Sequence, residues 1–232
     1  MLAHEPRQLP SWLIFDVGQI MITCDVTRAM VRDQLAFLEV NGFRYYKTSR
    51  EFRQKHANAT SSIVVNVVSH SPGSSALTFY LVVKIDEVER KKLELLGGPN
   101  SSWHQECTIS AYTVNFGPGS PHWDFPIRGH WDFGFEEEVW AAGPEIQAFT
   151  RDLSLPYVSR HIDPLEIRHT LLTARERTIN LRPYQEVLTI DLLYFDSNTL
   201  RDDVERMRES YRSMCPEFRS DFDRFSALAL KA

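Results

Sequence analysis

Cysteine is scarce in this chain of 232 residues: only Cys24, Cys107 and Cys215 occur, and they lie far apart. An odd number of widely spaced thiols cannot build a disulfide framework, and no C-x-x-C pair is present to hold a metal. We interpret the three as small buried or partly buried thiols. A few cysteines without a disulfide pattern are typical of proteins in a reducing compartment, so we expect a cytoplasmic protein.

Long apolar runs are also missing. No segment approaches the roughly 20 apolar residues that span a bilayer. The N-terminal sequence MLAHEPRQLPSW lacks the apolar region and the small-residue cleavage site of a signal peptide. The sequence therefore predicts neither membrane contact nor export.

Three motifs of common enzymes are absent: G-x-x-x-x-G-K-[ST], G-x-G-x-x-G and G-x-S-x-G. The glycine-rich stretches 97–101 and 117–121 contain proline where phosphate binding needs free backbone N–H groups, so we interpret them as turns. We assign no catalytic residue and no cofactor, and we favour a non-enzymatic protein.

The composition is sufficient for a folded core. Hydrophobic residues make up 43% of the chain and aromatic residues 12%, whereas charged residues make up 25%. The formal net charge is −5, while a general nucleic-acid binder usually carries a basic surface. We predict one domain over residues 1–232 and disfavour nucleic acid as its partner.

The first half of the sequence has the pattern of a helix and an antiparallel sheet. Apolar residues recur at helical spacing from Thr27, and Asn41-Gly42 is a typical helix end. The clearest hairpin has arms at 63–70 and 76–85, joined by a turn over Ser71–Ser74. Further predicted elements are strands over 12–23, 43–46, 51–53 and 107–116, and a helix over 87–96 capped by Asp86.

From about residue 135 we expect a mostly helical C-terminal part that can form a subdomain. Residues 184–195 fit a helix slightly better than a strand. Apolar residues spaced by four and three follow Leu200 and continue after Pro216; they indicate core packing, or alternatively a dimer surface. The fold class is therefore α+β, with an antiparallel sheet packed by an N-terminal helix. Helix starts are indicated at Glu136–Glu138, Pro144, Asp163-Pro164 and Thr199.

A short repeat places His122-Trp123-Asp124-Phe125 before His130-Trp131-Asp132-Phe133, with Pro126–Gly129 between them. In a strand, a histidine and an aspartate two residues apart point to the same side. A turn at Pro126–Gly129 would therefore gather the polar side chains, a set that suits a divalent transition metal or an acid–base pair. The alternative is an amphipathic hairpin or loop whose Trp and Phe side chains enter the core while its polar face is in contact with water. The candidate metal ligands are His122, Asp124, His130 and Asp132.

The predicted strands 43–46 and 51–53 have the pattern of two arms of an early hairpin, and basic residues cluster on it. Charged side chains on an edge strand commonly prevent the sheet from pairing with the edge of another chain, and these residues can have that role. They can also attract an acidic protein partner, and nucleic acid is a third reading. The candidate partner-binding residues are Arg44, Lys47, Arg50, Arg53 and Lys55.

The order of these motifs resembles a bacterial family known as domain of unknown function 4304. In the first half, the resemblance depends on Asn41-Gly42-Phe43-Arg44, Phe52-Arg53 and the strands IVVNVV and LTFYLVV. In the second half it depends on 137–140, 155–158 and 165–167. Val64-Val65-Asn66-Val67 and the HWDF repeat depart from the family pattern. Families of this kind occur beside bacterial toxins, which implies an immunity or antitoxin role and no established catalytic residue.

Three functional hypotheses follow. The first is a non-enzymatic domain that binds a protein partner, in its most specific form an immunity-type inhibitor of a toxin. The second is a metal-dependent hydrolase that uses the HWDF repeat, and the third is a dimeric regulatory module that pairs through the C-terminal apolar stripe.

Overall fold

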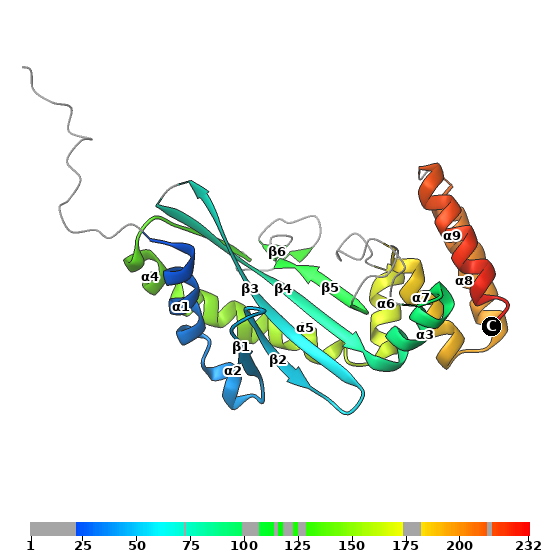
Figure 1. Cartoon of the computed structure of the whole chain (residues 1–232), viewed down its shortest axis with the longest axis horizontal. Coiled ribbons are helices and arrows are strands. Elements are labelled where there is room, and N and C mark those ends of the chain that lie inside the picture. Colours follow the sequence, from blue (N-terminus) through cyan, green and yellow to red (C-terminus); the bar gives the residue numbers. More distant parts are fainter. Residues whose placement is uncertain are drawn as a thin grey trace, which may run out of the picture.

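The computed structural model describes residues 22–71, 73–98, 107–113, 116–117, 123–124, 129–173, 182–212 and 215–232. Most of the predicted strand over 12–23 lies outside these residues. Its last two residues are not a strand, because Thr23 caps the first helix: its hydroxyl oxygen accepts the Val26 N–H at 3.3 Å. The fold is α+β, with a six-stranded antiparallel sheet, an N-terminal helix and a helical C-terminal part (Figure 1).

The sheet is built around one long hairpin. Strands β3 (Ala59–Ser71) and β4 (Ser74–Ile85) pair over nearly their whole length, with Ile63 opposite Leu81. The strand order is β1-β2-β3-β4-β5, and β8 also pairs with β4 beyond the end of β5. The predicted hairpins with arms at 43–46 and 51–53 and at 63–70 and 76–85 are therefore confirmed. The other strands are β1 (Arg44–Tyr46), β2 (Glu51–Lys55), β5 (Ile109–Tyr112) and β8 (His130–Phe133).

The N-terminal helix is divided in two. Helix α1 (Cys24–Gln34) ends at Leu35, and α2 (Phe37–Val40) follows after a single turn. The apolar residues that predicted one helix are buried in both pieces, so their spacing could not reveal the break. Gly42, at φ +86°, ends α2 in the left-handed conformation that a glycine tolerates best.

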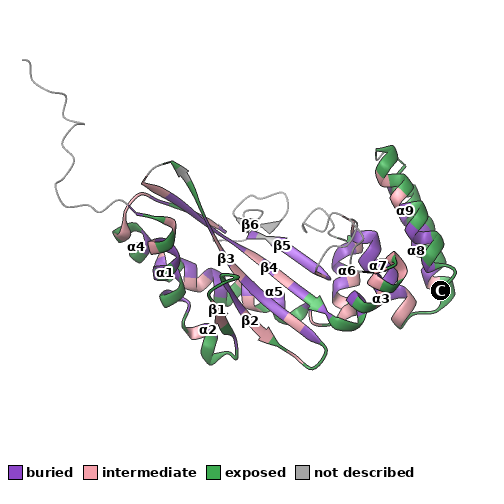
Figure 2. Cartoon of the chain, in the orientation of Figure 1, coloured by how far each residue is buried: buried purple, intermediate pink, exposed green. Residues whose placement is uncertain are grey.

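One face of the sheet is covered by helices. Helix α1 packs on β3, and the chain from α4 (Glu136–Phe149) through a π-helical turn (Thr150–Ser154) to α5 (Leu155–Arg160) runs along the same side (Figure 1). Figure 2 shows the resulting buried layer between the strands and these helices. At its centre the Trp131 ring contacts Phe149 edge-on, with ring centroids 5.4 Å apart.

Helix α4 begins at the acidic run and not at Pro144, which lies inside it. The Glu138 carboxylate accepts the Gly134 N–H at 2.5 Å and the Phe135 N–H at 3.2 Å, which fixes the start of the helix. The acidic first turn also suits the positive end of the helix dipole. Pro144 was therefore a wrong start signal, because a proline can occupy a helix interior when packing elsewhere outweighs its cost.

The remaining helices gather at one end of the sheet (Figure 1). Asp86 is the first residue of α3 and makes no capping bond, contrary to the prediction. Asp163 caps α6 as predicted, since its Oδ1 accepts the Leu165 N–H at 2.9 Å. The predicted cap Thr199 is wrong: Asp196 accepts the N–H groups of Asn198 and Thr199, both at 2.9 Å. These helices are α3 (Asp86–Leu96), α6 (Pro164–Thr173), α7 (Pro183–Tyr194), α8 (Ser197–Ser210) and α9 (Pro216–Ala229).

The apolar stripe of α8 and α9 is buried within the chain. The Tyr184 ring of α7 lies against Tyr211, Phe222 and Phe225, with centroids 5.5–6.2 Å apart. All four side chains are at most 2% exposed. The core-packing interpretation is therefore confirmed, and the stripe is not a free surface for a dimer.

Candidate functional site

In the part of the two HWDF segments that the structure describes, the repeats do not pair with each other. Strand β7 (Trp123–Asp124) pairs in parallel with β6 (Phe116–Gly117) as a separate two-stranded sheet. Strand β8, which holds the second repeat, pairs instead with β4. The predicted hairpin between the repeats is therefore wrong, because each segment has another strand as its neighbour.

The second repeat shows the amphipathic pattern of the alternative interpretation. Trp131 and Phe133 are buried, whereas His130 and Asp132 point the other way and contact each other, with 3.0 Å between Nε2 and Oδ2. No group of three or more metal-ligating side chains occurs among the residues that the structure describes. His122 lies outside them and the side chain of Asp124 is not described, so the four-ligand site stays a prediction.

The basic hairpin forms one edge of the sheet, where β1 is the last strand. Its inner side carries Tyr45 and Phe52, whose rings lie 4.9 Å apart in the core. Side chains alternate along a strand, so Arg44, Arg53 and Lys55 lie on the opposite, outer face. The structure thus brings these three predicted residues together, and it places Lys47 and Arg50 in the adjoining turn.

Two of the cations oppose each other directly. Arg44 and Arg53 are paired across the two strands, an arrangement of like charges that destabilises a sheet. Arg53 is held by the Glu51 carboxylate and lies 4.6 Å above the Tyr46 ring centre. Arg44 is exposed and makes no comparable contact with the residues that the structure describes. The hairpin therefore retains a positive charge that costs stability.

Most charges of the hairpin are also unbalanced. Arg44, Lys47, Arg50 and Lys55 are exposed and form no ion pair with any residue in the described ranges. The C-terminal helices differ, because their arginines are largely paired with carboxylates. These paired residues are Arg160, Arg168, Arg182, Arg206, Arg208 and Arg212.

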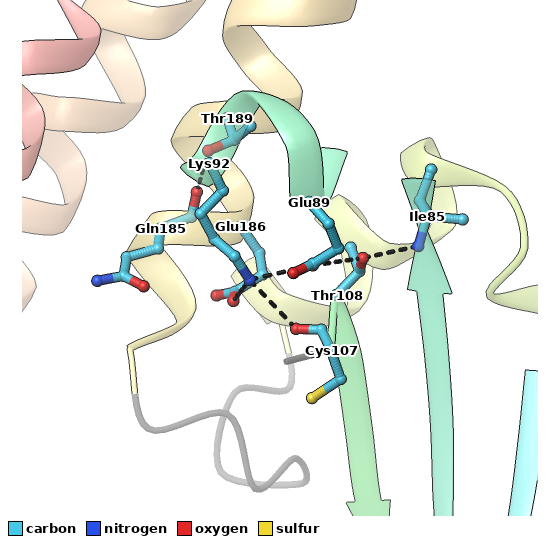
Figure 3. Close-up of polar contacts among 8 residues, drawn as sticks. All are labelled: Ile85, Glu89, Lys92, Cys107, Thr108, Gln185, Glu186 and Thr189. Carbon is cyan, nitrogen blue, oxygen red and sulfur yellow. Dashed lines mark hydrogen bonds and ion pairs between the residues drawn. The ribbon is translucent and has the colours of Figure 1, made fainter. Parts of the chain in front are cut away.

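A charged cluster lies between α3, α7 and the start of β5 (Figure 3). The Lys92 ammonium group donates to Glu89 and to Glu186, with both Nζ–Oε1 distances at 3.0 Å. It also donates to the Cys107 carbonyl at 3.3 Å. The side chains of Lys92 and Glu186 are fully buried and that of Glu89 is 3% exposed.

The cluster is tied to the sheet through Thr108. Its hydroxyl donates to Glu89 at 2.8 Å and accepts the Ile85 N–H at 2.8 Å. Figure 3 shows Ile85 at the end of β4 and Lys92 one turn beyond Glu89 on α3. The Thr108 hydroxyl therefore links the charged cluster to the backbone at the junction of β4 and α3.

Burial and charge set the protonation of this cluster. Burial alone would lower the pKa of Lys92, but the carboxylates of Glu186 and Glu89 more than offset it and raise the pKa. Burial raises the pKa of Glu186, and Lys92 only partly opposes that shift. One ammonium group thus faces two carboxyl groups, which leaves an excess of one negative charge when both are ionised.

A second cluster joins α6, α7 and α8. The Arg168 guanidinium contacts Asp191, with Nε 2.5 Å from Oδ1, and also pairs with Asp203. Arg206 adds a second contact to Asp203 at 3.1 Å. Burial raises the pKa of Asp191 to about 7 although Arg168 opposes the shift, and the neighbouring Asp203 raises it further.

His161 is a buried histidine with both ring nitrogens occupied. Nδ1 lies 2.8 Å from the Tyr157 carbonyl and therefore carries the proton, while Nε2 accepts from the Thr170 hydroxyl at 2.9 Å. Burial lowers the pKa of His161 to about 4, so the ring is neutral at pH 7.

These three groups are internal. Apart from the exposed Arg206, which contacts Asp203 on its own helix, their side chains connect neighbouring helices or strands, which is the geometry of a structural network. They join the C-terminal helices to one another and to the sheet, whereas a substrate or partner must reach an exposed group. The basic hairpin is therefore the stronger candidate for recognition.

Comparison with protein-family models, curated proteins and solved structures found no match to this chain. The resemblance to domain of unknown function 4304 stays a prediction. Among the residues that the structure describes, no helix has the length and apolar character needed to cross a membrane.

Proposed function

We propose that this chain is a non-enzymatic domain that binds an acidic protein through its basic hairpin, the segment Arg44–Lys55. The observation that carries the proposal is the set of exposed cations on this hairpin that have no carboxylate partner among the described residues. The chain as a whole is acidic, at −5, so a positive patch is a local exception that can steer an acidic partner to one place.

The opposed pair Arg44 and Arg53 adds to this argument. Like charges opposite each other lower sheet stability. Arg53 already contacts the Glu51 carboxylate, so an acidic partner that neutralises Arg44 would remove the remaining repulsion. An immunity-type inhibitor that covers an acidic surface of a toxin is the specific form of the proposal, and it would be supported by co-purification with the product of an adjacent gene.

A charge-reversal experiment tests the proposal. Arg44→Glu combined with Lys55→Glu reverses two cations of the hairpin. Arg201→Glu combined with Arg219→Glu is the matched control, because both arginines are exposed on the C-terminal helices and the net change is the same. Binding of each variant to fluorescent poly-L-glutamate and to a 20-base-pair DNA duplex is measured by anisotropy at increasing salt.

We expect the unaltered chain and the control to bind poly-L-glutamate at low salt, and the hairpin variant to bind at least about tenfold more weakly. Equal losses in both variants would contradict the proposal, since net charge alone would then explain binding. Tighter binding to the DNA duplex than to the peptide would contradict a protein partner and would indicate that the hairpin binds nucleic acid.

A single substitution separates recognition from folding. Arg44→Thr removes the repulsion with Arg53 and introduces a good strand former, so we expect the free energy of unfolding to rise by about 0.5 kcal/mol. The same variant should bind the acidic peptide more weakly. A fall in stability would show that Arg44 has a structural role instead.

A further inference from the structure

A cleft of about 430 Å³ opens between the sheet edge and the helical layer. One side is formed by the end of α2 and the end of β2, and the other by the π-helical turn and α5. Its volume is within the range of small-molecule sites. The lining residues that matter here are Phe43, His56, Arg151, Leu155, Ser159 and Ile162.

Arg151 is the one permanently charged side chain among the described lining residues. Its guanidinium lies 5.4 Å from the centre of the Phe37 ring on α2, a cation–π contact beside the cleft. Arg151 is exposed and has no ion pair within the part of the chain that the structure describes. Its charge is therefore available to an anion.

The turn that carries Arg151 is unusual. Residues Thr150–Ser154 form a π-helical turn between two α-helices, and such turns are frequent at functional sites. Thr150 and Ser154 are buried, so the turn is packed on its inner side, and the Thr150 hydroxyl donates to the Ile146 carbonyl at 2.8 Å one turn earlier. The exposed Arg151 is consequently presented from a fixed backbone.

Hydrogen bonds also hold the rim opposite Arg151. The Gln54 amide donates to the Asn41 carbonyl at 3.2 Å, and the Asn41 amide donates to the Phe37 carbonyl at 2.8 Å. His56 Nε2 lies 3.0 Å from the Ser61 hydroxyl. When that hydroxyl donates, His56 Nδ1 carries a proton and is a second donor for an anion.

We infer that this cleft binds a small monocarboxylate with an apolar body. Arg151 would take the carboxylate by charge-assisted hydrogen bonds. Phe43, Leu155 and Ile162 would contact the apolar part. One cation matches one carboxylate, while the apolar wall distinguishes the ligand from a simple inorganic anion. The inference does not depend on the proposed protein partner, since none of these residues belongs to the candidate cations of the hairpin.

The test is ligand binding to the full chain by NMR, with phenylacetate as the probe. Phenylacetamide is the neutral analogue of the same shape, and inorganic phosphate is an anion without an apolar body. Arg151→Met removes the charge but keeps the length of the side chain. Arg201→Met, on exposed α8, is the matched control.

We expect saturable binding of phenylacetate that is about tenfold or more tighter than binding of phenylacetamide. Arg151→Met should lose that preference, whereas Arg201→Met should keep it and both should give spectra of a folded protein. The inference is overturned if phenylacetate fails to saturate below about 10 mM, a concentration at which a site with a Kd of about 1 mM is about nine-tenths occupied. It is also overturned if phosphate binds as tightly or if Arg151→Met binds normally.

Discussion

Replacing Lys92 by methionine should destabilise this protein far more than any nearby change of charge. The substitution keeps a long unbranched side chain but removes the ammonium group that contacts Glu89 and Glu186, each at 3.0 Å. Two carboxyl groups would then remain together in a site that is 3% exposed or less. Breaking a buried ion pair in this way costs about 3–5 kcal/mol.

Because the cluster has two carboxyl groups and one ammonium group, Glu186→Gln should affect stability much less than Lys92→Met does. This change removes the excess negative charge and leaves Lys92 paired with Glu89 alone. We expect a change in unfolding free energy within about 1 kcal/mol. In Lys92→Met combined with Glu186→Gln, one carboxylate instead of two is left unpaired, so the double variant should be more stable than Lys92→Met.

The dependence on pH gives a further check. Burial raises the pKa of Glu186 in the folded protein, so its protonated form favours folding. That contribution is complete below the ordinary carboxyl pKa and decreases as the pH rises toward the raised value. Glu186→Gln resembles the protonated form at every pH, so its stability relative to the unaltered chain should increase from about pH 4 upward.

Urea unfolding followed by circular dichroism measures these differences. Glu94→Gln is the control, because Glu94 is an exposed partner of Lys91 on the same helix and should change stability by no more than about 0.5 kcal/mol. The reasoning is refuted if Lys92→Met is as mild as Glu94→Gln. It is equally refuted if Glu186→Gln costs as much as Lys92→Met.

Three other outcomes are expected. Gly129→Ala should lower the unfolding free energy by about 2–3 kcal/mol in urea titrations, since an added Cβ would lie 2.0 Å from a backbone oxygen, whereas Gly134→Ala should be tolerated. Asp191→Asn should abolish a loss of stability between about pH 4 and 7, because protonation at its raised pKa of about 7 favours folding; an unchanged pH profile would exclude this carboxyl. Asp196→Ala should lower the melting temperature more than Thr199→Ala, and the reverse order would contradict the observed cap.

Much of the sheet could be predicted because its signals are local. Alternating apolar residues over 63–70 and 76–85 and the Ser71–Ser74 turn define a hairpin without tertiary information. The division of the first helix at Leu35 could not be predicted, since the same apolar spacing is buried on both sides of the break. The local spacing of apolar residues predicts which side of a helix is buried, but it does not predict where the helix axis bends.

The internal charged clusters were missed for a related reason. Glu89 and Lys92 are three residues apart on a helix, a spacing that normally indicates a surface ion pair. Glu186 and Asp191 look like polar faces of a short helix, yet both are fully buried. Only the position of α7 among its neighbours makes these residues internal, and that position depends on contacts distant in sequence.

Helix α7 has no side that faces water over the stretch 183–191, where every residue is buried. It contacts α3, α6, α8 and α9, and both charged clusters include one of its carboxyl groups. An isolated helix of this length is marginal in water, so α7 should not be stable until the helices that contact it have formed. It should consequently be among the last elements to form during folding. Its formation should complete the contacts that connect the C-terminal helices to the strands.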